Sequence, residues 1–156
     1  MFEWLTAGGA LKPFFDGVLQ GAGITFYTSS LGFLFGLALG VVLLVLRASG
    51  GSVARALVIV YVSAMRGTPL LIQLLIAYYV LPTLIGIQIS PVTAGILALT
   101  LNTAAYISEI LRGALSTIPR GQTAAAHALG MGPWQLWRYV LLPQMFHRAV
   151  PPLTNE

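Results

Sequence analysis

Three long runs of apolar residues set the organisation of the chain. They extend over about 22–46, 57–81 and 92–111, and each is long enough for an α-helix to cross a bilayer, which takes roughly 20 residues. A fourth apolar run, 136–153, is interrupted by charged residues and by three prolines. The pattern predicts an all-α, polytopic transmembrane helical bundle with three spans. Residues 136–156 are expected to form a partial further segment that lies on the membrane or re-enters it.

Composition supports a membrane protein. The chain is 57% hydrophobic and 8% charged, with a mean hydropathy of +0.86, whereas about a quarter of the residues of a soluble domain are charged. It has no cysteine, so disulfides and thiolate metal sites are excluded. The net charge of +4 is spread along the chain and does not form the basic patch expected of a nucleic-acid-binding protein. We therefore expect one transmembrane domain over 1–156.

The arginines predict the orientation of the spans. Arg47 and Arg55 flank the first connection, and Arg112, Arg120 and Arg138 surround the third, whereas residues 82–91 carry no charge. Because cytoplasmic loops of membrane proteins are enriched in Lys and Arg, the first and third connections are expected in the cytoplasm and the amino terminus outside. The first apolar run is too long for a signal-peptide core and should remain in the mature protein.

Small residues recur along the first span. Thr28, Gly32, Gly36 and Gly40 are four residues apart and therefore lie on one helix face. Such stripes let helix backbones approach closely inside a membrane. We expect this face to pack against another helix of the bundle or against a partner subunit.

The second span contains the sequence Arg66-Gly67-Thr68-Pro69. Pro69 cannot donate a hydrogen bond to the carbonyl of Met65, so a kink is predicted there. An arginine at the bilayer centre costs about 2.5–3.5 kcal/mol on insertion scales unless it reaches water or a partner. The residues leave two interpretations open: a snorkelling arginine beside an ordinary proline kink, or the lining of a water-filled path.

The third span carries a polar face made by Asn102, Tyr106, Glu109 and Gly113, which share one side of a helix. A carboxylate within a span is expected to face the bundle interior or an aqueous path and to have a partner. Arg112, three residues after Glu109, is the nearest candidate. A substrate path and a structural network between helices are both compatible with this face.

A short helix is predicted in the loop 117–135 that follows the third span. Pro119 suits a first helical position and Gly130 suits the residue after a helix, where positive φ is allowed. Ala125, Ala128 and Leu129 then form one small apolar face, against which another protein can approach the helix backbone closely. An amphipathic helix lying on the membrane is the alternative.

The loop resembles the EAA loop of the membrane subunits of bacterial binding-protein-dependent ABC importers. The matching residues are Gly121, Gln122, Ala125, Ala126, Ala128, Leu129, Gly130, Met131 and Leu142-Pro143-Gln144. One position departs from that pattern, because Ala124 stands where the family has an acidic residue. The resemblance implies that the loop docks an ATPase through Gly121, Gln122, Ala124, Ala125, Ala128, Leu129 and Gly130.

The stretches 66–73 and 102–113 are similar to permeases of polar amino-acid ABC importers, the histidine/glutamine/arginine/opine class with the MetI-like fold. The resemblance implies a substrate pathway made by Arg66, Thr68, Gln73, Asn102, Tyr106 and Glu109. It also implies a bacterial inner-membrane subunit that pairs with a second permease as a homo- or heterodimer. Its other partners are ATP-binding subunits, an extracytoplasmic substrate-binding protein and membrane lipid, and ATP is hydrolysed on a separate chain.

Members of that family continue beyond the position of Glu156, so the bundle is expected to be incomplete at its carboxy terminus. This leaves two alternatives, an inactive permease remnant and a small structural or assembly membrane protein. An intramembrane enzyme is disfavoured, because His127 and His147 have no companions at metal-ligand spacing and no hydrolase motif occurs. We therefore predict no catalytic residue, no metal and no cofactor.

Overall fold

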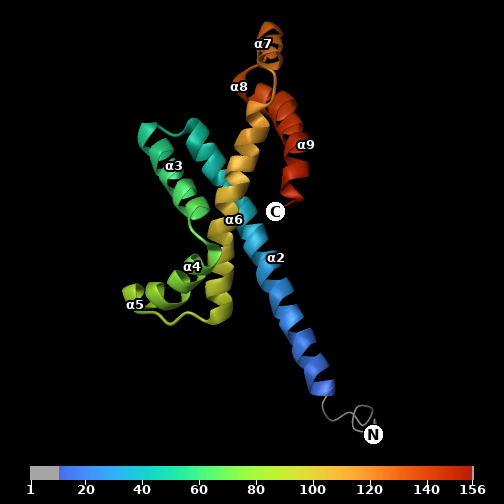
Figure 1. Cartoon of the computed structure of the whole chain (residues 1–156). Coiled ribbons are helices and arrows are strands. Elements are labelled where there is room, and N and C mark those ends of the chain that lie inside the picture. Colours follow the sequence, from blue (N-terminus) through green and yellow to red (C-terminus); the bar gives the residue numbers. More distant parts are fainter. Residues whose placement is uncertain (1–10, 156) are drawn as a thin grey trace.

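The computed structural model describes residues 11–155, and helices make up nearly all of this range (Figure 1). No β-strand occurs between residues 11 and 155, so the predicted all-α fold is confirmed. Residues 1–10, which include the amino terminus expected on the outer side of the membrane, and Glu156 lie outside the described residues. The elements are α2 (Leu11–Ser49), α3 (Ser52–Gly67), α4 (Leu70–Leu75), the π-helix η1 (Ile76–Val80), α5 (Leu81–Ile85), α6 (Pro91–Ser116), α7 (Arg120–Ala128), α8 (Pro133–Gln135), the π-helix η2 (Leu136–Leu141) and α9 (Leu142–Leu153).

Two helices of the described range, α2 and α6, are long and apolar enough to cross a membrane. The 39 residues of α2 give a length of about 58 Å at 1.5 Å per residue, well beyond a hydrocarbon core of about 30 Å. Helix α6 begins at the expected break, because the Ser90 hydroxyl accepts a hydrogen bond from the Thr93 amide at 3.2 Å and Pro91 occupies the first turn. Helix α2 contains the apolar run 22–46, and α6 contains the run 92–111. Each helix extends beyond its run at both ends.

The second apolar run differs from the single kinked helix that the sequence predicts over 57–81. Helix α3 ends at Gly67 and the next helix starts at Leu70, with a bend of 107° between the two segments. Thr68 (φ −116°, ψ 141°) and Pro69 (φ −60°, ψ 138°) are both extended. The residue before a proline disfavours the α region, so the chain leaves the helix for two residues before it resumes. This bent pair provides a third span if it crosses as one unit.

The glycine stripe of α2 packs against α6, which confirms the predicted close-packing face. A Cβ atom added at Gly32, Gly36 or Gly40 meets a side-chain atom of α6 at 2.6–2.8 Å. Leu99, Thr103 and Ile107 provide those atoms. The α2 backbone can approach α6 this closely only because these three positions carry no side chain. Helices α2 and α6 form the most extensive helix contact of the described residues.

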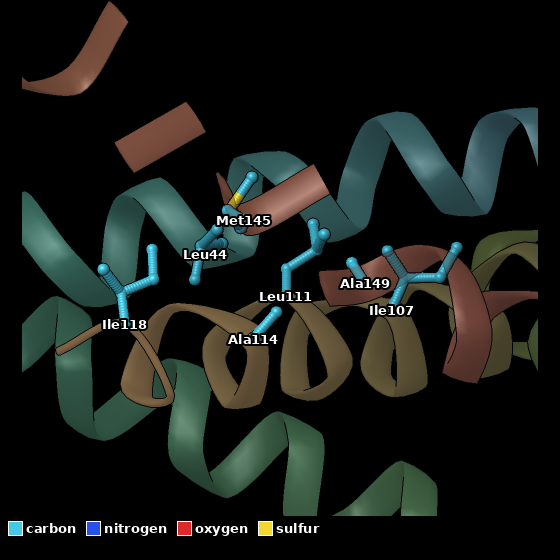
Figure 2. Packing of buried hydrophobic residues seen from close by; sticks show 7 residues of the cluster. All are labelled: Leu44, Ile107, Leu111, Ala114, Ile118, Met145 and Ala149. Atoms are coloured by element: carbon cyan, nitrogen blue, oxygen red, sulfur yellow. The ribbon is translucent and has the colours of Figure 1, made fainter. Parts of the chain in front are cut away.

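Helix α9 folds back along α6 and forms one hydrophobic core with α2 and α6 (Figure 2). Met145 and Ala149 of α9 are buried, and Figure 2 shows them beside Leu111 and Ile107 of α6. The full cluster consists of Leu44, Ile107, Leu111, Ala114, Ile118, Met145 and Ala149. Helix α6 is thus central, because α3 and α4 also pack on it.

The connections alternate between the two ends of the molecule. In Figure 1 the turn between α2 and α3 lies toward the same end as α7, and the connection between α5 and α6 lies at the opposite end. The first and third connections therefore lie at one end and the second connection at the other, as the distribution of arginines predicts. The assignment of the α7 end to the cytoplasm stays a prediction.

Candidate functional site

Three arginines from three helices surround one carboxylate. Glu109 of α6 accepts a hydrogen bond from Arg47 of α2 through Oε1, and from Nε and Nη2 of Arg112 through Oε2 at 2.9 and 2.6 Å. Arg66 of α3 lies 4.0 Å from the same Oε2. The predicted pair between Glu109 and Arg112 is therefore present. The Glu109 side chain is 15% exposed, so this carboxylate holds α2, α3 and α6 together from a mostly enclosed position.

Arg66 also lies over an aromatic ring. Its guanidinium carbon is 5.2 Å from the centroid of the Tyr106 ring, a distance at which a cation is attracted to the face of the ring. Arg66 is nevertheless 46% exposed. Its position between the Tyr106 ring and the Glu109 carboxylate explains how an arginine is accommodated in an apolar stretch.

Gln73 stabilises the break between α3 and α4. Its amide nitrogen donates to the carbonyl of Met65 at 2.8 Å, and to the carbonyl and hydroxyl of Thr68 at 3.1 and 2.9 Å. The Met65 carbonyl is the acceptor that Pro69 leaves unpaired. Gln73 is itself buried, and therefore replaces a lost helix hydrogen bond at a site where unpaired groups are costly.

The same glutamine joins the break to α6. Its side-chain oxygen accepts a hydrogen bond from Nδ2 of Asn102 at 3.2 Å. The six residues predicted to form a substrate pathway are thus brought together in two adjacent groups: Thr68, Gln73 and Asn102 in one, and Arg66, Tyr106 and Glu109 in the other. Since Asn102 and Tyr106 are one turn apart on α6, the two groups are neighbours.

A small polar pocket opens beside Arg66 and Glu109. It has a volume of about 230 Å³ and is lined by Arg47, Ile59, Val62, Ser63, Arg66 and Glu109. Among residues 11–155 no group of three or more His, Cys, Asp or Glu side chains is placed to hold a metal ion. The chemistry available in the pocket is that of guanidinium groups, which bind carboxylate or phosphate oxygens.

Arg47 is the member of the cluster that sequence reasoning missed. Its place at the end of the first span indicates only the orientation of that span. A signal was present in the sequence, because Glu109 is the only acidic residue between positions 17 and 155, where there are seven arginines. An isolated acidic residue in a span requires a basic partner, but the identity of a partner 62 residues away depends on how the helices cross.

The loop after α6 contains the predicted short helix, α7. Pro119 precedes its first turn as the N-cap residue, one position earlier than expected, and Gly130 has the predicted positive φ, at 73°. Ala126 is buried, and Nε2 of Gln144 in α9 donates to Oε1 of Gln122 at 3.3 Å. These contacts fix the side of α7 that faces the rest of the chain.

Most of the remaining surface of α7 is open. Ala124, Ala125 and Ala128 are exposed, and Leu129 is 76% exposed. Figure 1 shows α7 projecting beyond the end of α6. An exposed leucine beside small residues, on a helix that is held in place along one edge, is a shape that another protein can contact closely.

Relatives of this chain are membrane subunits of transport systems. A family model described as binding-protein-dependent transport system inner membrane component matches residues 32–156. The chain is 36% identical to the glutamine transport system permease protein of Escherichia coli K12 over 156 residues, 99% of this chain and 69% of that protein. It is 40% identical to the arginine transport system permease protein of Bacillus subtilis 168 over 139 residues, 89% of this chain and 64% of that protein.

Solved structures give the same result. A crystal structure of an amino acid ABC transporter with histidines superposes with a TM-score of 0.78 and 30% sequence identity, covering 90% of this chain and 69% of that one. An inward-facing structure of the MetNI methionine ABC transporter superposes with a TM-score of 0.60 and 29% identity, covering 96% of this chain and 67% of that one.

Proposed function

The chain belongs to the family of binding-protein-dependent transport system inner membrane components, and from this premise we propose that it is the membrane subunit of an ATP-driven importer of polar amino acids. It is a multi-pass membrane protein of the amino-acid ABC permease class. In the proposed complex it pairs with a second permease and receives substrate from an extracytoplasmic binding protein in a bacterial inner membrane. ATP is hydrolysed on a separate subunit.

The observation that carries this proposal is the presentation of α7. The helix is held along one edge by Ala126 and by the contact between Gln122 and Gln144, and it leaves Ala125, Ala128 and Leu129 exposed. We propose that this exposed face inserts into a groove of the ATP-binding subunit. The positive φ of Gly130 ends the helix there, so that the chain turns back toward η2 without obstructing the face.

A steric substitution on this face tests the docking. We expect Ala128→Trp to abolish recovery of the ATP-binding subunit when the tagged chain is purified from membranes in mild detergent. Ala56→Trp is the matched control, because Ala56 is an exposed alanine of α3 outside the α7 face. Equal recovery with both variants would rule out docking through this face.

The missing acidic residue of the motif allows a second test of the same interface. Ala124 is exposed, so Ala124→Glu adds a charge without disturbing a core. If the ATP-binding subunit carries a basic partner for that position, Ala124→Glu will increase its recovery and the increase will shrink at high salt. Unchanged recovery would mean that the shape of the face is sufficient.

We further propose that Arg66, Thr68, Gln73, Asn102, Tyr106 and Glu109 line or control the substrate pathway. Support comes from their convergence at the break between α3 and α4, since non-helical backbone in a membrane is tolerated where it is enclosed by protein or lines a water-filled cavity. The alternative of an inactive remnant has no specific observation in its favour, because an exposed docking face and an intact polar network are both present.

A further inference from the structure

We propose that the pocket beside Glu109 is a binding site for an oxyanion, either a phosphate or a carboxylate group. The pocket lies between α2, α3 and α6 and presents the guanidinium groups of Arg47 and Arg66 around a volume of about 230 Å³. That volume holds a phosphate or carboxylate group with its neighbouring atoms. The carboxylate source rests on the proposed transport function, whereas the phosphate source does not.

The cluster of arginines around Glu109 carries a net positive charge that favours an additional anion. Arg47, Arg66 and Arg112 contribute three positive charges and Glu109 one negative charge, which leaves a surplus of two. The next acidic residue of the described range, Asp16, precedes Arg47 on α2 by 31 positions, about 46 Å along the helix. No acidic side chain between residues 17 and 155 other than Glu109 exists to neutralise that surplus.

Glu109 is already fully engaged, and the arginines are not. Both oxygens of Glu109 accept hydrogen bonds, from Arg47 and Arg112. Arg47 uses a single nitrogen in this bond, and Arg66 donates no hydrogen bond to another residue of the 11–155 range. Since a guanidinium has five N–H donors, the two arginines retain donors directed at the pocket, where a two-oxygen acceptor is the complementary ligand.

Part of the pocket lining is apolar, which strengthens the attraction between its arginines and an anion. Ile59 and Val62 line it together with Ser63, and Val62 is buried against Ala104 and Ala105 in the core between α3 and α6. Charges beside such a surface are screened less than charges in open water. An anionic phospholipid provides the phosphate if the pocket opens to the bilayer, since basic pockets between membrane helices bind such headgroups. A transported amino acid provides the carboxylate if it opens to the pathway.

Binding measurements on the purified full chain in nanodiscs test the site and separate the two sources. The first probe is phosphatidylglycerol in a phosphatidylcholine background, with retention on the protein followed by native mass spectrometry. The second probe is L-glutamine, and its α-carboxamide, which lacks the carboxylate, is the comparison. Binding of each is measured by the shift in the thermal unfolding temperature of the protein. Preferential retention of phosphatidylglycerol identifies the ligand as a lipid phosphate. Stabilisation by glutamine but not by its α-carboxamide identifies the ligand as a carboxylate.

Variants tie either signal to the pocket. Arg66→Gln is expected to weaken the responding probe at least about tenfold, as the loss of a charge-assisted hydrogen bond implies. Arg55→Gln, which removes the same charge from an exposed position of α3 outside the pocket, should leave binding within about twofold. Ser63→Leu fills the pocket at constant charge and is expected to match Arg66→Gln, which keeps the test decisive if Arg66→Gln fails to fold.

The proposal is overturned if the wild-type chain retains both lipids equally and glutamine stabilises it no more than the carboxamide does. Equal loss of binding in Arg66→Gln and Arg55→Gln also overturns it, because the effect is then one of net charge. Neither result depends on the recovery of the ATP-binding subunit. Failure of the anion site is thus distinguishable from failure of the transport proposal.

Discussion

Replacement of Gly36 by alanine should separate α2 from α6. An added Cβ meets Thr103 Cβ at 2.8 Å and the Thr100 carbonyl oxygen at 3.2 Å, whereas carbon atoms pack best at about 3.5–4.0 Å. The obstructing atoms belong to the backbone or lie next to it, so rotation of a side chain cannot relieve the overlap. The helices must therefore move apart by up to about 1 Å.

The stability effect follows from two opposing terms. Overpacking of a well-packed contact costs about 1–3 kcal/mol, and replacing glycine by alanine within a helix stabilises by up to about 1 kcal/mol. Gly23→Ala is the matched control on the same helix, because its Cβ meets no described atom within 4 Å. We expect Gly23→Ala to be neutral or stabilising and Gly36→Ala to be less stable than Gly23→Ala by about 1–3 kcal/mol.

Unfolding of the purified chain in increasing dodecyl sulfate, followed by circular dichroism, measures this difference. Comparison of the two variants cancels the helix propensity, which both share. If Gly36→Ala proved as stable as Gly23→Ala, the close approach of α2 and α6 would not contribute to the fold, and the interpretation of the stripe as a packing face would be wrong.

Two further substitutions probe the polar network. Gln73→Leu leaves the Met65 carbonyl and the Asn102 amide without their partner and should lower the local opening free energy by about 1–2 kcal/mol. Hydrogen exchange of the first amides of α4 should then accelerate roughly tenfold. Unchanged exchange would show that Gln73 does not stabilise the break between α3 and α4. Glu109→Gln should destabilise by about 1–3 kcal/mol, less than the 3–5 kcal/mol typical of a fully buried pair, because Arg66 and Arg112 are each 46% exposed. Double-mutant cycles that combine Glu109→Gln with arginine-to-methionine changes measure the coupling energy of each pair. The coupling energy of Glu109 with Arg47, which is 25% exposed, should exceed that with Arg66, which lies 4.0 Å away. The reverse order would contradict this geometry.

Local sequence signals determined much of this fold. Ser90-Pro91 begins α6, Gly130 adopts positive φ after α7, and the glycines of α2 mark its contact with α6. Each of these features depends on residues within one or two helical turns, so each can be recognised without knowing the tertiary structure. The helices α2, α6 and α7 were therefore predictable, although the ends of α2 and α6 differ from the apolar runs by several residues.

The features that could not be predicted depend on contacts between distant residues. Pro69 indicates a kink, but an angle of 107° depends on two extended residues and on the side chain of Gln73, which reaches back to Met65. The sequence does not indicate that α9, despite Pro151 and Pro152, continues as a helix and packs Met145 and Ala149 on α6. A periodic pattern shows which face of a helix is apolar, but it does not identify the partner of that face.

The position of Arg47 shows how a local pattern and a distant contact are connected. Gly40 is the last member of the stripe, and Arg47 follows it by seven residues, so both lie on the side of α2 that faces α6. The glycines bring that side against α6, and the arginine side chain then reaches Glu109, which also binds Arg112 and lies near Arg66 of α3. The stripe therefore positions the first arginine of the cluster, and its loss should affect the anion pocket as well as stability. A Gly36→Ala variant that unfolds more easily yet keeps full oxyanion binding would show that the pocket is formed by α3 and α6 alone.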